Sequence, residues 1–158
     1  MDEKSKKTAL RMFTYGTYVL TSSYNDEICA ATVTWVSQAS FDPPLISVCI
    51  KRESRSFSTV KQSKKLVLHL LSHEQKDYAA AFFKPSELVD GNINGHTFSI
   101  NDYKMPILDE PPAYLECDVI EILENGDHPL FLVEVKNAVV RKEINPLELR
   151  KTGWSYGG

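Results

Sequence analysis

Residues 32–45 read TVTWVSQASFDPPL, a run that alternates hydroxyl-bearing and apolar residues and then stops at two prolines. Thr, Val and Trp suit a pleated, half-buried surface, so the pattern predicts a strand that starts at Ile28 and runs to Val36. Pro43 and Pro44 then end it sharply, because proline has no N–H for a strand ladder.

This stretch also carries candidate binding groups. An edge strand leaves backbone N–H and C=O groups free, and these could hydrogen-bond a flat heterocycle while hydroxyls reach a polar tail. The hydroxyls are those of Thr32, Thr34, Ser37 and Ser40, with an amide at Gln38. A Thr-rich edge strand without any ligand is the alternative interpretation.

The rest of the chain is mostly short strands. Strands are predicted at 17–22, 45–50, 65–71, 113–123 and 130–142 in addition to 28–36. Helices are predicted within residues 1–13, at 54–64 and at 74–83, and the Pro- and Gly-rich residues 84–112 form a looped excursion with one short strand near 96–100. Strands and helices do not alternate as in a doubly wound sheet, so we expect a small antiparallel barrel.

Length and charge limit the protein class. The chain has 158 residues, 42% hydrophobic residues and a net charge of −3, which predict one domain over 1–158 and argue against a nucleic-acid partner. No apolar run approaches the roughly 20 residues that span a bilayer. The N-terminal residues lack the apolar region of a secretory signal, so we expect a cytoplasmic protein that does not contact membranes.

A second motif lies at residues 51–58, KRESRSFS, where a helix is predicted to begin. Arg52 and Arg55 lie here beside Ser54, Ser56 and Ser58. Unpaired N–H groups, the positive end of the helix dipole and guanidinium groups all favour a bound phosphate. A capped surface helix with solvated arginines is the alternative.

Metal binding is not predicted. Cys29, Cys49 and Cys117 form no CxxC pair and are expected to be reduced, mostly buried thiols. His69 and His73 are four residues apart, but the first falls in a predicted strand and there is no HExxH motif.

Taken together, ATVTWVSQASFDPPLISVCI, the Ser-rich helix, QSKKLVLHLLSHEQKDYAAAFF and NGDHPLFLVEV resemble the flavin reductase-like family, the flavin mononucleotide (FMN)-binding split barrels. This resemblance implies a mainly β, Greek-key, FMN-binding split β-barrel with two or three short helices. It also implies flavin contacts at Thr32, Val33, Thr34, Trp35 and Val36, continuing along Gln38, Ala39 and Ser40. Phosphate contacts are implied at Ser54, Arg55, Ser56 and Phe57, with Arg52 as a helper.

The same resemblance suggests where a nicotinamide lies. His128 in GDHPLF matches the family histidine near the nicotinamide, although a turn residue that bonds a nearby carbonyl is the alternative. Trp35 stands where many relatives have a small polar residue. In the tail, residues 144–158, Trp154 and Tyr156 either cover a flavin or fill a groove.

The implied function is an NAD(P)H-dependent flavin reductase, in which hydride passes from NADH or NADPH, a transient co-substrate, to flavin N5. No catalytic acid or base is predicted, since the cofactor performs the chemistry. The resemblance implies a homodimer that delivers electrons to an acceptor protein or to free flavin. One alternative is a flavoredoxin-like FMN electron carrier without nicotinamide turnover, and another is a structural barrel with an empty site.

Overall fold

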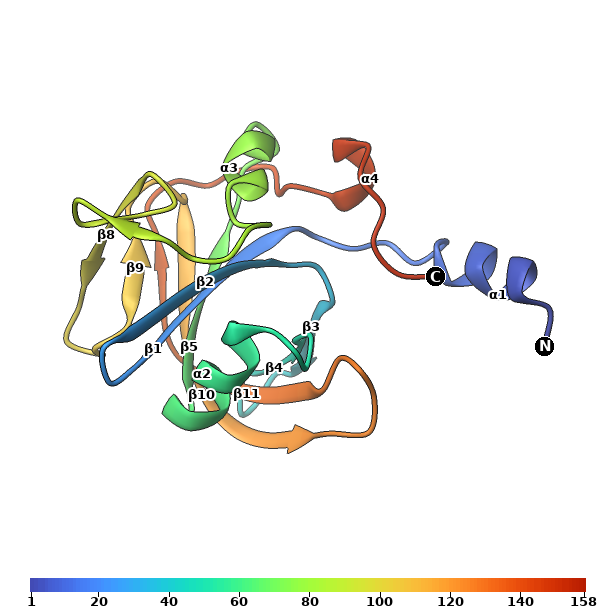
Figure 1. The fold of residues 1–158 in the computed structure, drawn as a ribbon, viewed down its shortest axis with the longest axis horizontal. Coiled ribbons are helices and arrows are strands. Elements are labelled where there is room, and N and C mark those ends of the chain that lie inside the picture. Colours follow the sequence, from blue (N-terminus) through green and yellow to red (C-terminus); the bar gives the residue numbers. More distant parts are fainter.

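The main sheet has seven strands in the spatial order β2-β1-β5-β10-β11-β4-β3, all paired antiparallel, in the computed structural model of residues 1–158 (Figure 1). Few helices accompany it, as the predicted fold class requires: α1 Glu3–Leu10, α2 Arg55–Ser63, α3 Lys76–Ala80 and α4 Leu149–Thr152. The seven strands are β1 Tyr18–Tyr24, β2 Glu27–Val33, β3 Val36–Ser40, β4 Leu45–Cys49, β5 Lys65–Leu70, β10 Ala113–Leu123 and β11 Leu130–Val140.

The sheet must curl into a barrel, because strands β2 and β3 form its two edges yet only Thr34 and Trp35 lie between them. In a flat sheet, six strand spacings would separate the edges by about 29 Å. Three Cα steps from Val33 to Val36 reach about 11 Å at most. The edges therefore approach each other without pairing, which gives a split barrel.

The strand predicted from Ile28 to Val36 is wrong in one respect: two strands replace it. The backbone turns at Thr34, whose C=O accepts a hydrogen bond from the N–H of Val36 at 3.0 Å. The C=O of Trp35 accepts from the N–H of Cys49 at 2.9 Å. These bonds fix the crossing from one edge to the other, a long-range effect that local strand propensity does not contain.

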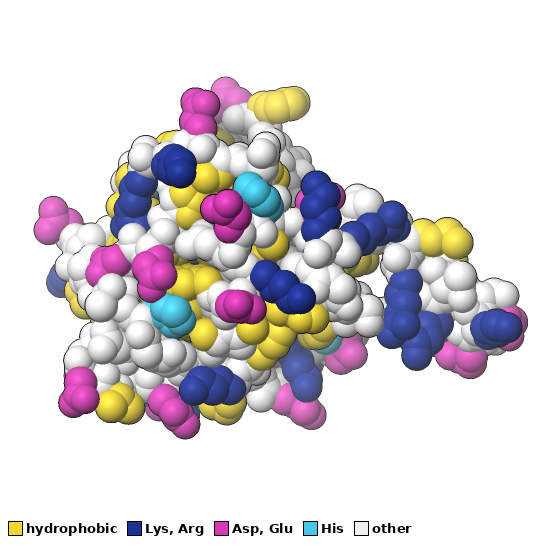
Figure 2. Space-filling view, turned by 90° about the horizontal axis from the view of Figure 1, so that it is seen from above, with side chains coloured by type: hydrophobic (Ala, Val, Ile, Leu, Met, Phe, Trp, Pro, Cys, Tyr) yellow, Lys and Arg dark blue, Asp and Glu magenta, His cyan; other side chains and the backbone are white.

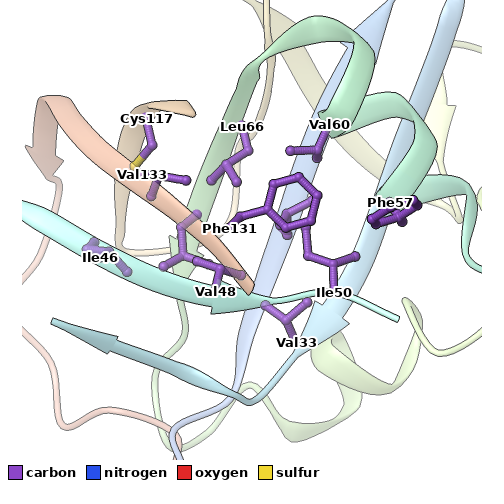
Figure 3. Close-up of a cluster of buried hydrophobic side chains, with 12 residues drawn as sticks. Val33, Ile46, Val48, Ile50, Phe57, Val60, Leu66, Cys117, Phe131 and Val133 are labelled. Atoms are coloured by element: carbon purple, nitrogen blue, oxygen red, sulfur yellow. The ribbon is translucent and has the colours of Figure 1, made fainter. Parts of the chain in front are cut away.

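The barrel interior holds the largest cluster of buried apolar side chains (Figure 3). Phe57 of α2 packs edge-on against Phe131 of β11, with ring centroids 5.7 Å apart. α2 contacts β1, β2 and β5, and so covers one end of the barrel. The cluster consists of Leu20, Val33, Ile46, Val48, Ile50, Phe57, Val60, Leu66, Leu68, Cys117, Phe131 and Val133.

A second cluster lies on the outer face of β1 and β2. Val19 and Leu20 are adjacent on β1 and both fully buried, but they belong to different clusters because successive strand residues face opposite sides. Tyr78 and Phe82 from the α3 region pack onto this outer face. β1 is therefore buried on both sides.

The excursion at 84–112 was predicted with one short strand, and the structure corrects this to four. They are β6 Leu88–Val89, β7 Asn92–Ile93, β8 His96–Ile100 and β9 Pro106–Leu108, which form a small meander. The third predicted helix, 74–83, is reduced to α3, although Gln75 Oε1 accepts from the Ser72 N–H at 2.9 Å as a capping box requires. α4 was not predicted.

α1 projects from the body of the molecule and buries none of its residues (Figure 1). The basic side chains grouped on this projecting end are clear in Figure 2. Met12 and Phe13, which follow α1, are also exposed. None of the four helices combines the length and apolar character needed to cross a bilayer.

Candidate functional site

A cavity of about 540 Å³ opens where the end of β2, the Thr34–Trp35 crossing, the first turn of α2 and the tail meet. It lies at the split between the two sheet edges. Six of the residues that the family resemblance implied as flavin contacts line it: Thr32, Val33, Thr34, Trp35, Ser54 and Ser56. His128 lines it as well. The structure thus brings the two motifs, separated by about 20 residues, to one hollow.

Thr32 uses its own polar groups inside the protein. Its hydroxyl donates to the C=O of Ala79 at 2.6 Å, and its backbone N–H donates to the C=O of Phe82 at 3.2 Å. Ser86 similarly occupies both backbone groups of Ala30. The outer edge of β2 is therefore largely satisfied by residues 79–86, and the free backbone groups expected there are fewer than the sequence implied.

The other predicted flavin contacts lie elsewhere. Val36, Gln38 and Ser40 line a second hollow of about 400 Å³, formed with residues of β4, β5 and β10, and Ala39 is exposed on β3. They separate from Thr32 because β3 is the opposite edge of the sheet.

The start of α2, whose Ser54 and Ser56 line the cavity, has unpaired backbone donors. Ser54 is the N-cap: its hydroxyl accepts from the Phe57 N–H at 3.1 Å and donates to the Lys51 C=O at 2.7 Å. The N–H groups of Arg55 and Ser56 donate to no backbone carbonyl, as expected of a helix start. No acidic residue lies in this turn, although Glu53 directly precedes the N-cap, so no carboxylate within the turn competes for the positive end of the helix dipole.

The two predicted arginines have different surroundings. Arg52 bonds the Glu124 carboxylate at 3.1 Å and the carbonyls of Glu124 and Gly126 at 2.7 and 3.1 Å, so it stabilises the turn before β11 and does not line the cavity. Arg55 does not line the cavity either; it is exposed, with one weak bond to the Ser86 C=O at 3.4 Å. Lys51 lines the cavity instead, and the sequence had not singled it out. Phe57 belongs to the core.

His128 lies in the turn between β10 and β11 and faces the tail. Its Nδ1 is 3.0 Å from Asp127 Oδ1, and its Nε2 is 2.6 Å from the Tyr156 hydroxyl. The hydrogen bond with His128 lowers the pKa of the Asp127 carboxyl. Burial raises the pKa of the Tyr156 phenol. The imidazole ring is also close to Trp35, with ring centroids 4.7 Å apart.

Several polar atoms of cavity residues are buried without a partner: Thr17 Oγ1, Thr34 Oγ1 and Trp35 Nε1. A buried polar group left unpaired costs about 1–3 kcal/mol. Together with the α2 N–H groups and Lys51, these atoms fit a polar, phosphorylated ligand. Thr17, Lys51, Phe82 and Phe83 were missed because only the three-dimensional fold brings them to the site.

His69, considered from the sequence as half of a metal-binding pair with His73, has both ring nitrogens bonded to the backbone in the structure. His69 is fully buried; its Nδ1 lies 3.0 Å from the C=O of Val19, and its Nε2 accepts from the Leu108 N–H at 3.0 Å. It therefore joins β5, β1 and β9.

Comparison with known proteins defines the class. The family model of the flavin reductase like domain matches residues 10–154. The chain therefore belongs to the flavin reductase-like family, in agreement with the sequence prediction.

Two similar proteins and one similar solved structure illustrate the family. The "Probable flavin reductase" of Rhizobium meliloti is 27% identical over 163 residues, covering 99% of this chain and 48% of the relative, so the chain spans about half that protein's length. The reductase component of 4-nitrophenol 4-monooxygenase/4-nitrocatechol 2-monooxygenase from Rhodococcus opacus is 24% identical, covering 87% of this chain and 72% of the relative. The solved structure of flavin reductase PheA2 superposes with a TM-score of 0.78 at 28% identity, covering 94% and 93% of the two chains.

Proposed function

We propose that this chain binds FMN in the cavity and acts as an NAD(P)H-dependent flavin reductase. One observation carries the proposal: a single cavity is lined by Lys51 and by Ser54 and Ser56 at the start of α2, where backbone N–H groups are unpaired, and it holds buried polar atoms that lack partners. Membership of the flavin reductase-like family supports the same ligand.

Each residue has an assigned role in this proposal. The N–H groups of Arg55 and Ser56, with Lys51 and the Arg55 guanidinium, hold the FMN phosphate. Val33, Thr34 and Trp35 line the part of the cavity that takes the ring. Bound FMN supplies the redox chemistry, since it accepts a hydride equivalent at N5 from a reduced nicotinamide. The protein orients both rings and needs no acid–base pair of its own.

The reduced flavin or its electrons pass to an acceptor, and the reductase component from Rhodococcus opacus suggests an oxygenase as that partner. We further propose a homodimer. The second hollow is lined mainly by apolar residues, it lies beside the unpaired edge of β3, and Phe41 at the following turn is 91% exposed. A twin subunit would cover this edge. Sedimentation velocity of the FMN-loaded protein should give a dimer, and a stable monomer would contradict it.

The decisive experiment is anaerobic stopped-flow mixing of the FMN-loaded protein with NADH or NADPH, followed at the flavin absorption bands. If the protein is a reductase, the flavin absorbance falls during the mixing experiment because the nicotinamide reduces FMN. A protein that binds FMN but stays yellow is the electron carrier of the alternative hypothesis. A purified protein that takes up no FMN would refute the proposal altogether.

A further inference from the structure

The tail returns across the molecule after β11 and ends over the cavity. Gly16 forms a bridge with Glu148, and Ser72 forms one with Pro146, so the tail is fixed as far as α4. Beyond α4 it has no regular secondary structure. Trp154 packs edge-on against Phe83 with centroids 4.7 Å apart, and the next residues lie over Trp35.

Tyr156 lies against both Trp35 and His128, whose own rings are in contact with centroids 4.7 Å apart. Its ring centroid is 5.4 Å from that of Trp35 and 5.7 Å from that of His128. In the neutral imidazole, Nδ1 carries the proton toward the Asp127 carboxylate, which can only accept. Nε2 then accepts the phenol proton at 2.6 Å. Trp35 and His128 therefore hold a planar ring that carries an in-plane hydrogen-bond donor.

Resting on the proposed function, we propose that the Tyr156 phenol is an internal occupant of a ring subsite and that the reduced nicotinamide ring enters by displacing it. The chemistry matches, since a nicotinamide is also a planar ring with an in-plane donor, the carboxamide N–H. That donor replaces the phenol O–H on His128 Nε2. Tyr156 thereby sets how tightly the dinucleotide binds.

The position of the tail in which Tyr156 contacts Trp35 and His128, here called the closed position, is held by few contacts. Displacement of Tyr156 is therefore feasible. It buries Trp35 Nε1 without a partner. Past Trp154, its polar anchors are the Tyr156–His128 bond and a 3.1 Å bond from Arg11 Nε to the Gly157 C=O. Tyr156 itself is 44% exposed. When the competent state is only partly populated, the apparent dissociation constant rises by the inverse of that fraction, so removing the occupant tightens binding.

Two variants test this by different means. Tyr156→Ala removes the ring. Gly157→Ala keeps the ring but adds a Cβ 2.9 Å from Trp35 Cζ2 at a backbone φ of +90°, which forces the segment away from the indole. Tyr24→Ala is the matched control, because Tyr24 is 41% exposed on β1 and does not line the cavity.

With saturating FMN, both tail variants should lower KM for NADH and NADPH by about 2- to 10-fold, the range that one hydrogen bond contributes. Tyr24→Ala should leave KM unchanged. Independently of turnover, acrylamide should quench Trp35 emission more strongly in Tyr156→Ala than in its parent when both carry Trp154→Phe, which leaves Trp35 as the one tryptophan.

An unchanged or raised KM in Tyr156→Ala, or unchanged quenching of Trp35, would overturn the inference. Failure of the proposed function looks different: the wild-type protein would then bind no FMN or leave FMN oxidised in the presence of NADH. If the wild-type enzyme turns over normally and Tyr156→Ala has the same KM, the role of Tyr156 is refuted and the proposed function is not.

Discussion

Arg52 and Arg55 lie three residues apart, yet substitution of Arg52 should lower stability whereas substitution of Arg55 should weaken FMN binding. Arg55 is exposed and its one hydrogen bond is the 3.4 Å contact with the Ser86 C=O, so Arg55→Ala leaves no buried group unpaired. Stability should change by less than about 0.5 kcal/mol. FMN binding should weaken, because the guanidinium at the start of α2 is a predicted phosphate contact.

The magnitude follows from exposure. A hydrogen bond to a charged group contributes about 1.5–3 kcal/mol, and solvent screening at an exposed guanidinium favours the lower end. Arg55→Ala should therefore weaken FMN about tenfold. Riboflavin lacks the phosphate and should bind about as before. The loss for FMN should shrink as ionic strength rises.

Arg52→Ala is the matched control. It removes the bonds to the Glu124 carboxylate and to the carbonyls of Glu124 and Gly126. The unfolding free energy should fall by about 1 kcal/mol, a Tm decrease of about 2–4 °C, while the ratio of FMN to riboflavin affinity stays unchanged. Titration calorimetry with both ligands and thermal melting of both variants give the comparison. Equal losses of FMN and riboflavin in Arg55→Ala would refute a phosphate at this helix.

Three further outcomes are expected. Ser54→Ala removes the N-cap bond to the Phe57 N–H and should lower the unfolding free energy by about 1 kcal/mol in urea titrations, whereas Ser58→Ala, an exposed serine of the same helix, should lower it less. Ser86→Ala strips both backbone partners from Ala30 and should destabilise by about 1–3 kcal/mol; a neutral result would mean that water replaces the serine. Burial lowers the pKa of His69 from 6.5 to about 3, so the unfolded state binds a proton that the folded state does not between these values. His69 should therefore cost about 2 kcal/mol of stability on going from pH 7 to pH 5, and the pH dependence should be flatter in His69→Asn, as denaturation at the two pH values will measure.

The elements that the sequence predicted well are those whose signals are local. Ser54 was expected to cap α2 and does so, and the strand at 113–123 has the predicted bounds. Strand β5, a near-continuous apolar run, is buried on both faces: Leu66 and Leu68 belong to the barrel core, and Val67 packs with Met105 and Ile107. Such patterns depend on neighbouring residues and need no knowledge of the fold.

The misses depend on contacts between distant residues. Whether Thr34 continues a strand or ends it is decided by the Cys49 N–H, which pairs with the Trp35 C=O. The meander of β6 to β9 is stabilised by its packing on the β1–β2 face, through Ile93 and Leu108. Its Pro- and Gly-rich composition alone indicates only a loop. Propensity describes each segment in isolation, so it could not predict the end of the strand at Thr34 or the β6 to β9 meander.

The Thr34–Trp35 crossing, which the sequence did not predict, also forms the site. Because Thr34 and Trp35 carry the chain from one edge of the barrel to the other, no ladder pairs these edges and a cavity opens between them. Trp35 thereby lies against His128 from the β10–β11 turn and beneath the tail. A small residue at this position would remove the indole that Tyr156 packs against, so the bulky side chain and the tail depend on each other. Trp35→Ser should accordingly release the tail as Tyr156→Ala does, and limited proteolysis should then cleave residues 153–158 faster. Equal cleavage of Trp35→Ser and the wild-type protein would show that the Trp35 side chain does not hold the tail.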